Sequence, residues 1–407
     1  MLCHLLEFQP KKEKNMSKRA TVQLPLHLKK HLSAGHPWVY RDHVPPGMRF
    51  ESGTWVRVTC GPWTGFGLWD ATSPIAIRIF SQQQTPNADW IAAQVAAAWE
   101  LRAPLRQTAT SAYRVLFGEG DGLPGITVDL YGAYAVIATY ADSVRTLVPW
   151  VVAALREIVP LEGIVERVAR EEAEADAKIR LLWGQLPPPD LMIEEHGLKF
   201  RANLFAGQKT GLFLDHRENR HFLESWSYGR RVLNCFSYTG AFSLYAAWGG
   251  ATEVVSCDIA PAAAEDARVN FGLNGFNPNN YEFLVEDCFA LLERYANAGR
   301  RFDLVILDPP SFASTKRQAH AAVRAYTRLN QLALRCVAPG GLLASASCTS
   351  QVSPEHFRAM LAEAASNAGC QLQILHDAGQ PLDHPVPAHF PEGRYLKFML
   401  CRVKSVV

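Results

Sequence analysis

The sequence predicts an α/β protein with three units: an N-terminal β-barrel, a small central α/β domain and a C-terminal Rossmann-like domain. Three observations lead to this prediction. Short strands punctuated by glycine and proline fill the first unit, Pro187-Pro-Pro forms a stiff break, and strands alternate with helices from residue 191 onward. A chain of 407 residues has room for two or three domains.

The first unit is predicted to span residues 21–87 and to follow a disordered basic tail at residues 1–20, with Met16 as an alternative start. Residues 1–50 hold nine lysines and arginines against three acidic residues. Within the barrel, the run Ile75-Ala-Ile-Arg-Ile-Phe alternates in polarity, so we expect a half-buried strand with Arg78 on its polar face. The tryptophans of this unit are expected to lie mostly in its core.

The central domain is predicted to span residues 88–190. An alanine- and tryptophan-rich helix over 88–104 connects it to the barrel, and strands at 126–130 and 134–139 form a hairpin. The glycine-rich loop before this hairpin, Gly118-Glu-Gly-Asp-Gly-Leu-Pro-Gly, lacks the Lys-Ser/Thr of a P-loop, which argues against a phosphate cradle.

The third unit, residues 191–407, is predicted to hold a doubly wound, mostly parallel sheet. The strands are expected at 231–236, 253–258, 281–287, 302–307, 341–347, 371–375 and 395–403. No helical pattern follows the run at 395–403, so we expect that strand to pair antiparallel.

Composition narrows the class of protein. The formal net charge of +2 argues neither for nor against a nucleic-acid partner. The nine cysteines occur singly, without a CxxC pair. This pattern predicts a reducing compartment without a disulfide framework or a metal site. No apolar run reaches the roughly 18 residues of a membrane-spanning helix. We therefore expect a cytoplasmic protein without membrane contact.

Three acidic residues are predicted to end successive strands of the third unit: Asp258, Asp287 and Asp308. In open α/β sheets, ligands bind beyond the carboxyl ends of the strands. The first strand opens into Ser237-Tyr-Thr-Gly-Ala, whose single glycine differs from the GxGxxG of dinucleotide sites. A strand-end aspartate can simply cap the next helix, but three in succession favour a positively charged adenosine ligand such as S-adenosylmethionine. NAD is the principal alternative.

Several motifs carry a resemblance to class I S-adenosylmethionine-dependent RNA methyltransferases. The chain looks most like the bacterial family that makes 5-methylcytosine in large-subunit (23S) ribosomal RNA. The matching stretches are His36-Pro-Trp-Val, Asp121-Gly-Leu-Pro-Gly, Glu194-Glu-His-Gly, Gln208-Lys-Thr-Gly, Leu214-Asp-His-Arg, Leu233-Asn-Cys-Phe-Ser-Tyr-Thr-Gly-Ala-Phe, Asp308-Pro-Pro-Ser-Phe, Ser347-Cys-Thr, His384-Pro-Val and Pro391-Glu-Gly-Arg-Tyr-Leu-Lys. The resemblance implies a PUA barrel that docks RNA, a central domain and a catalytic domain. This chain departs from the family at His216, where glutamine is usual, and at Thr349, where serine is usual.

The resemblance also implies the cofactor site. Asn234, Tyr238 and Thr239 are expected to line the methionine side of S-adenosylmethionine, Asp258 to hold the ribose and Asp287 the adenine. The complete expected set is Gln208, Thr210, Gly211, Asn234, Tyr238, Thr239, Asp258, Asp287 and Asp308.

For catalysis, the resemblance points to Cys348 as a nucleophile that adds to carbon 6 of cytosine, with Asp308 holding or protonating the ring. Cys348 alone among the nine cysteines follows a strand end within a polar loop. Ribosomal RNA is the expected partner, and the oligomeric state stays open, a homodimer being one option. Two other functions are carried forward: methylation of a purine nitrogen, and an inactive RNA-binding assembly factor.

Overall fold

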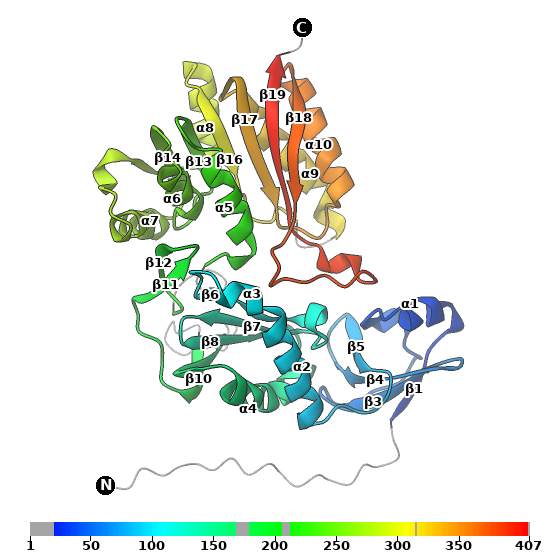
Figure 1. The fold of residues 1–407 in the computed structure, drawn as a ribbon. Helices are drawn as coiled ribbons and strands as arrows, with labels where there is room; N and C mark the ends of the chain where they lie inside the picture. Colours follow the sequence, from blue (N-terminus) through cyan, green and yellow to red (C-terminus); the bar gives the residue numbers. More distant parts are fainter. Residues whose placement is uncertain (1–19, 168–178, 206–211, 314–315, 406–407) are drawn as a thin grey trace, which may run out of the picture.

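A computed structural model describes residues 20–167, 179–205, 212–313 and 316–405. Figure 1 shows three successive units along the chain, with the sheet of the third unit standing above the other two. The predicted tail, apart from residue 20, and three of the predicted cofactor residues, Gln208, Thr210 and Gly211, lie outside the described residues. In the described part of the chain, no helix is both long and apolar enough to span a membrane.

The N-terminal unit is a five-stranded sheet in the order β1-β3-β4-β5-β2. Its strands are β1 Thr21–Gln23, β2 Trp38–Tyr40, β3 Trp55–Cys60, β4 Trp63–Trp69 and β5 Ile75–Ser81, with the short helix α1 at Lys29–Ser33. Strands β1 and β3 are parallel and the other pairs antiparallel.

The expectation of a half-buried strand at β5 is wrong. Arg78 is only 4% exposed, and its Nη1 lies 3.8 Å from Asp70 Oδ2. The central domain covers the face that carries Arg78: a Cβ on Gly125 would lie 3.2 Å from the Arg78 Nε. The alternating polarity correctly separates the two faces of β5, but both faces are buried in the structure.

The central unit is a second five-stranded sheet in the order β10-β9-β8-β7-β6. Its elements are α2 Ala88–Leu101, α3 Ala103–Arg106, β6 Ala112–Phe117, β7 Ile126–Tyr131, β8 Tyr134–Thr139, α4 Val148–Ile158, β9 Gly163–Arg167 and β10 Ile179–Gly184. The predicted hairpin is present as the antiparallel pair β7 and β8. Helices α2 and α4 pack against the sheet through one apolar cluster.

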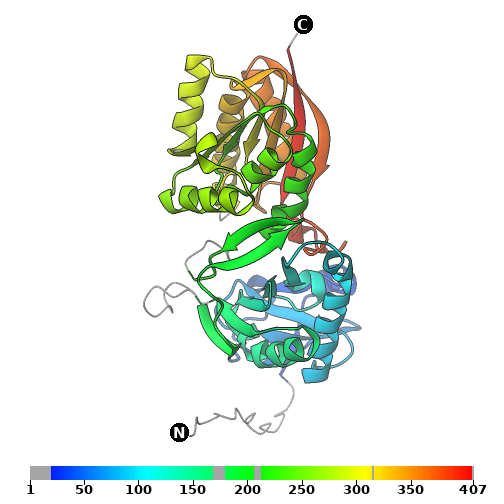
Figure 2. The same cartoon turned by 60° about the vertical axis from the view of Figure 1, so that its left-hand side comes forward.

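A two-stranded hairpin, β11 Leu191–Glu195 and β12 Leu198–Ala202, joins the central and C-terminal units. Figure 2 shows it between the lower and upper halves of the molecule. On one side, Ser111 N donates to Glu194 O (2.8 Å), and on the other, Arg201 N donates to Asn270 Oδ1 (2.9 Å). The hairpin is a separate sheet, which the alternating pattern from residue 191 did not predict.

The C-terminal unit holds a seven-stranded sheet in the order β15-β14-β13-β16-β17-β19-β18. Its strands are β13 Arg231–Cys235, β14 Glu253–Asp258, β15 Glu282–Val285, β16 Phe302–Leu307, β17 Val337–Ser347, β18 Cys370–Ala378 and β19 Lys397–Ser405. The first five are parallel, whereas β19 pairs antiparallel with both β17 and β18. The doubly wound sheet and the antiparallel final strand are therefore confirmed.

Helices cover both faces of this sheet because successive strand residues point to opposite sides. Val232 packs in the cluster with α5, α6 and α7, whereas Leu233 packs in the cluster with α8, α9 and α10. These helices are α5 Arg217–Ser225, α6 Ala241–Trp248, α7 Pro261–Leu273, α8 Cys288–Ala298, α9 Ala319–Leu334 and α10 Pro354–Asn367. The carboxyl ends of the parallel strands form the edge where the site lies.

Asp383 connects the central and C-terminal units through buried hydrogen bonds. Its carboxylate accepts two bonds from Arg217 (2.8 and 3.0 Å) and one from the backbone N–H of Arg114 (2.8 Å). Its carbonyl accepts from Arg102 Nη2 (2.8 Å). Burial alone would raise the pKa of Asp383, but His384 and Arg217 hold it well below its usual value.

Candidate active site

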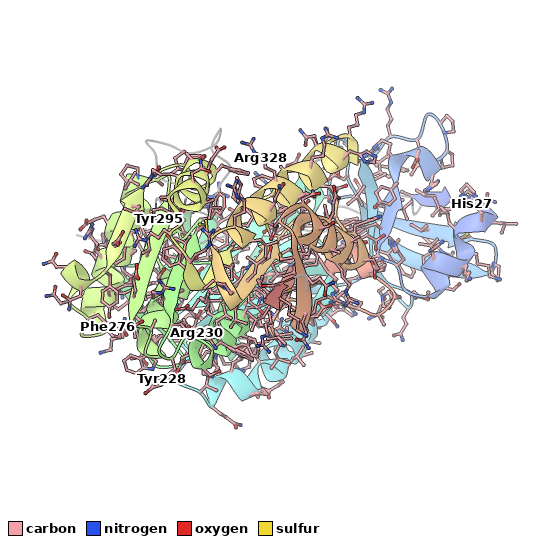
Figure 3. The ribbon with its side chains drawn as sticks, turned by 90° about the horizontal axis from the view of Figure 1, so that it is seen from above. His27, Tyr228, Arg230, Phe276, Tyr295 and Arg328 are labelled. Atoms are coloured by element: carbon pink, nitrogen blue, oxygen red, sulfur yellow. The ribbon has the colours of Figure 1, made fainter. Side chains whose placement is uncertain are left out.

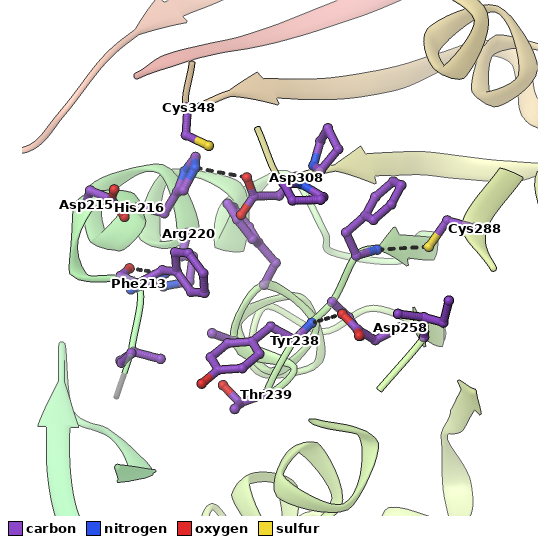
Figure 4. A pocket seen from close by; sticks show the side chains of 18 of the residues that line it. Phe213, Asp215, His216, Arg220, Tyr238, Thr239, Asp258, Cys288, Asp308 and Cys348 are labelled. Atoms are coloured by element: carbon purple, nitrogen blue, oxygen red, sulfur yellow. Dashed lines mark hydrogen bonds and ion pairs between the residues drawn. The ribbon is translucent and has the colours of Figure 1, made fainter. Parts of the chain in front are cut away.

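A pocket opens at the carboxyl edge of the seven-stranded sheet (Figure 4). Asp258 ends β14, Asp308 follows β16, and Cys348 follows β17, so three separate strands deliver their side chains to one cavity. Other lining residues are Leu212, Phe213, Asp215, His216, Arg220, Phe236, Ser237, Tyr238, Thr239, Ile259, Asp287 and Cys288. Most of the predicted site residues that the structure describes thus lie together.

The loop after β13 has an unusual backbone. Phe236, Tyr238 and Gly240 have φ values of +60°, +46° and +74°, a region that residues with a Cβ rarely adopt. The loop is fixed by Ser237 N donating to Cys257 O (2.9 Å) and Gly240 N donating to Ser237 O (2.9 Å). Such strain persists only where surrounding contacts hold it, and it is common at ligand sites.

Asp258 holds the same loop. Its Oδ2 accepts from the Tyr238 N–H (2.9 Å) and its Oδ1 from the Ala260 N–H (3.0 Å). A carboxylate has about four lone-pair sites, so two acceptor positions remain for a ligand. Beside it, Ile259 is 70% exposed, which gives the pocket an apolar surface suited to a flat base.

Asp287 lies two residues beyond the end of β15 and caps helix α8, its Oδ1 accepting from Ala290 N (2.9 Å). The strand predicted over 281–287 is therefore shorter than expected. Asp287 therefore has both positions: one carboxylate oxygen caps the helix, and the residue also lines the pocket.

Asn234 does not line this pocket, which corrects the expectation that it faces the methionine side of the cofactor. Its side chain is fully buried, and its Nδ2 donates to Ser243 Oγ (2.9 Å) on helix α6. Asn234 precedes the strand end, so its side chain points into the sheet–helix interface. We conclude that Asn234 connects β13 to helix α6 beneath the loop that follows the strand.

His216 faces Asp308, with Nε2 3.2 Å from Asp308 Oδ1 (Figure 4). Its other ring nitrogen, Nδ1, lies 3.1 Å from Asn219 Nδ2. The His216–Asp308 contact is close but lacks hydrogen-bond geometry, since Nε2 has no hydrogen-bond partner among the described residues. The residue that departs from the family pattern therefore lies against the carboxylate predicted to be catalytic.

Cys348 is partly exposed at the pocket, and Figure 4 shows its sulfur on the side of His216 and Asp308. A buried lysine stands close by: Lys397 is 0% exposed, and its Nζ donates to the carbonyls of Thr349 and Tyr395. Burial lowers the pKa of Lys397 to about 8, while Cys348 acts in the opposite direction. A cation within electrostatic range of the thiol stabilises the thiolate form.

Most of the other described cysteines are more buried than Cys348. Cys235, Cys257, Cys288, Cys336 and Cys401 are all buried, and only Cys348 and Cys370 among the described cysteines outside the barrel are partly exposed. Burial raises the pKa of Cys336 to about 11 and that of Cys401 to about 12. These thiols pack as apolar groups, as predicted for Cys235 and Cys257.

Sequence reasoning assigned no role to Lys397, Ile259 or Phe213. Phe213 packs edge-on against Tyr238, with ring centroids 5.2 Å apart. A lysine inside the otherwise apolar stretch Leu396–Cys401 is the one signal that could have been noticed, because lysine is almost never fully buried without a partner.

Comparisons with known proteins identify the class of protein to which the fold belongs. A family model described as S-adenosylmethionine-dependent methyltransferase matches residues 168–389, and a PUA-like domain model matches residues 22–82. The fold and the site define a methyltransferase of this class with an N-terminal PUA-like domain, which confirms the predicted fold class and the predicted cofactor, S-adenosylmethionine.

Relatives match nearly the whole chain. Proteins named ribosomal RNA large subunit methyltransferase I are 35% identical in Aeromonas salmonicida and 37% in Erwinia tasmaniensis, each alignment covering 92% of this chain and 97% of the relative. The chain belongs to the family of these relatives, ribosomal RNA large subunit methyltransferase I.

Solved structures share the fold. A Streptococcus mutans protein described as a SAM-dependent methyltransferase has a TM-score of 0.84 at 23% identity, covering 94% of this chain and 100% of its own. A structure of SMU.776, described as a methyltransferase and complexed with SAH, has a TM-score of 0.85 at 24% identity with the same coverage.

The residues present fit S-adenosylmethionine. Asp258 keeps two acceptor positions for the ribose hydroxyls, and the buried hydroxyl of Thr239 has no hydrogen-bond partner among the described residues. The exposed Ile259 offers an apolar surface for adenine. When bound, this cofactor supplies an electrophilic methyl group.

Proposed function

We propose that the protein methylates carbon 5 of a cytosine in large-subunit ribosomal RNA through a covalent adduct with Cys348. The observation that carries this proposal is the partly exposed Cys348 thiol in one pocket with Asp258 and Asp308, beside the buried ammonium of Lys397. The names of the relatives support ribosomal RNA as the substrate. The cofactor contacts proposed are those of Tyr238, Thr239, Asp258 and Asp287, together with the earlier assignment of Gln208, Thr210 and Gly211.

The chemistry explains why a cysteine is needed. Carbon 5 of cytosine is a weak nucleophile, so the Cys348 thiolate first adds to carbon 6, which makes carbon 5 electron-rich. Once carbon 5 carries the methyl group, a carboxylate or a water molecule takes its proton, and departure of the thiolate restores the ring. Each addition is thereby balanced by an elimination.

Asp308 is proposed to act on nitrogen 3 of the ring, where negative charge develops during thiolate addition. In this role Asp308 carries a proton or holds the protonated ring. His216 lies beside it, with its Nε2 3.2 Å from Asp308 Oδ1. Lys397 has a separate role, because its ammonium stabilises the thiolate that leaves at the end of the reaction.

The test uses RNA that contains 5-fluorocytosine, which has no removable proton at carbon 5, so the covalent intermediate should accumulate. Wild-type enzyme with S-adenosylmethionine should form a protein–RNA adduct that survives denaturation, whereas Cys348→Ala should form none. Cys370→Ala is the matched control, since Cys370 is also partly exposed but lies on β18 outside the pocket.

Two outcomes would contradict the proposal. Near-normal methylation by Cys348→Ala would favour transfer to a purine nitrogen, which needs the Asp308 loop but no cysteine. A wild-type enzyme that binds RNA and transfers no methyl group would favour the inactive assembly factor.

A further inference from the structure

His216 has a buried ring nitrogen that the described residues leave without a hydrogen-bond partner. The side chain is 1% exposed and lines the pocket at the carboxyl edge of the sheet. Its Nε2 lies 3.2 Å from Asp308 Oδ1, but that contact lacks hydrogen-bond geometry. Because a buried polar group without a partner costs free energy, a group of this kind on a pocket wall indicates that a ligand supplies the partner.

The contacts of the other ring nitrogen identify Nε2 as a donor. Nδ1 lies 3.1 Å from the amide nitrogen of Asn219, which also donates to the carbonyl of Gly379 (3.5 Å). An amide nitrogen can only donate, so Nδ1 accepts this bond. The neutral imidazole of His216 therefore carries its proton on Nε2.

Few groups of the pocket can compete with His216 as a donor to substrate. Among the described residues that line the pocket, only His216 and Arg220 have side-chain nitrogens. The guanidinium of Arg220 is engaged by Glu195 (2.6 and 2.8 Å) and by the carbonyl of Phe213 (2.9 Å). His216 thus supplies the side-chain N–H of this lining that stays available to a substrate.

The imidazole ring is held in place by aromatic neighbours. Phe242, on α6, packs edge-on against it with ring centroids 5.4 Å apart, and Phe398, on β19, does so with centroids 6.1 Å apart. A donor that is fixed before the substrate arrives needs no reorganisation during the reaction.

The position of His216 matches the charge that the proposed reaction develops. When the thiolate forms its bond to carbon 6 of cytosine, the electron pair of the C5–C6 double bond spreads over carbon 5, nitrogen 3 and oxygen 2. Nitrogen 3 and oxygen 2 are attached to the same ring carbon, so two protein groups 3.2 Å apart can face both of them. Asp308 is proposed to act on nitrogen 3, which leaves oxygen 2, a hydrogen-bond acceptor, for the N–H of His216.

We propose that His216 Nε2 donates a hydrogen bond to oxygen 2 of the target cytosine and stabilises the negative charge there while Cys348 is bonded to carbon 6. The proton stays on His216, so the residue acts by electrostatic stabilisation and transfers no proton. This inference rests on the proposed function, because it takes cytosine as the target base.

The test combines two variants with two RNAs. His216→Leu removes the donor, whereas His216→Gln keeps an N–H donor in the form of an amide. One RNA is a fragment of large-subunit ribosomal RNA in which the cytosine that the wild type methylates has been mapped by bisulfite sequencing. The other carries 2-thiocytidine at that position, whose sulfur is a weaker hydrogen-bond acceptor than oxygen.

The kcat for methylation is measured on both RNAs at saturating S-adenosylmethionine. The wild type should methylate the 2-thiocytidine RNA at least fivefold more slowly than the cytosine RNA. His216→Leu should lose at least tenfold in kcat on the cytosine RNA and no more than about twofold further on the 2-thiocytidine RNA, because the same contact cannot be lost twice. His216→Gln should recover part of the kcat together with its dependence on oxygen 2.

Two control variants separate this contact from packing. Phe398→Leu disturbs a neighbour of the His216 ring but leaves the donor in place, so it should keep the wild-type ratio between the two RNAs. Tyr228→Leu changes a side chain that is 81% exposed, at the outer edge of the C-terminal unit (Figure 3), and its kcat should stay within twofold of wild type. Calorimetry should show that His216→Leu binds S-adenosylmethionine as the wild type does.

A wild type that methylates both RNAs equally well would overturn the inference without any variant. An equal dependence on oxygen 2 in the wild type and His216→Leu would do the same, since His216 would then have only a structural role. If the wild type forms 5-methylcytosine while His216→Leu keeps a normal kcat, the contact fails and the proposed function stands. If the wild type forms no 5-methylcytosine in ribosomal RNA, the proposed function fails, and the contact with it.

Discussion

Replacing Lys397 with methionine is expected to change stability and activity in opposite directions. Lys397 is fully buried, and burial lowers its pKa from the usual 10.5 to about 8. Because the folded state binds this proton more weakly than the unfolded chain, the charged lysine destabilises the fold. The destabilisation is fully present below pH 8 and is relieved as the pH rises from 8 toward 10.5.

The magnitude follows from the two pKa values. The pKa difference between 10.5 and about 8 corresponds to a destabilisation of about 3 kcal/mol, at roughly 1.4 kcal/mol per pKa unit. Of this destabilisation, roughly 2–3 kcal/mol is relieved between pH 7 and pH 10. Urea unfolding of wild type and Lys397→Met at these two pH values measures it. The carbonyls of Thr349 and Tyr395 lose their donor at both pH values, so their contribution cancels.

Lys404→Met is the matched control, since Lys404 lies on the same strand but is exposed. Between pH 7 and pH 10, the free energy of unfolding of the wild type should rise by roughly 2–3 kcal/mol relative to that of Lys397→Met. Relative to Lys404→Met it should not change. Methylation by Lys397→Met at pH 7 should fall at least tenfold, because the thiolate of Cys348 loses its cation. A stability difference independent of pH, or normal methylation by Lys397→Met, would refute this reasoning.

Two further predictions concern carboxylates. Asp258→Ala should weaken S-adenosylmethionine binding more than tenfold in calorimetric titration, because charge-assisted hydrogen bonds contribute ~1.5–3 kcal/mol each; unchanged affinity would remove Asp258 from the cofactor site. Asp383→Ala should lower the free energy of unfolding by about 3–5 kcal/mol, since it leaves the buried Arg217 without its partner. As the pKa of Asp383 lies well below its usual 3.8, wild-type stability from this pair should persist above pH 4 and be lost only at lower pH; a stability loss already complete near pH 5 would contradict the assignment.

The sequence allowed the three units and the strand-end carboxylates to be predicted because both depend on local patterns. Periodicity located β16 at its observed bounds, Phe302–Leu307, and the carboxyl-edge rule placed Asp258 and Asp308 in one pocket. Burial by another unit was not predictable in the same way. Arg78 is buried because the central domain packs against its face of β5, and the sequence of β5 alone does not predict that contact.

The contacts that distant segments make at the site were also beyond sequence reasoning, although His216 and Lys397 both stand in the matching stretches. His216 and Lys397 approach Asp308 and Cys348 from about 50 to 90 positions away along the chain. Asn234 shows the converse error: a motif residue next to a strand end was expected in the pocket, but the pleat turns it toward Ser243. Family motifs identify which residues matter, and only packing decides whether they touch the ligand.

The place of β19 in the sheet has a consequence for how the enzyme is made. The N-terminal and central sheets are each built from contiguous chain, so they can fold while synthesis continues. The catalytic sheet cannot, because β19 lies between β17 and β18 and is translated after both. Until residues 395–405 leave the ribosome, Cys348 lacks the neighbouring Lys397. The catalytic sheet, and with it the surroundings of Cys348, can therefore be completed only after β19 has been synthesised.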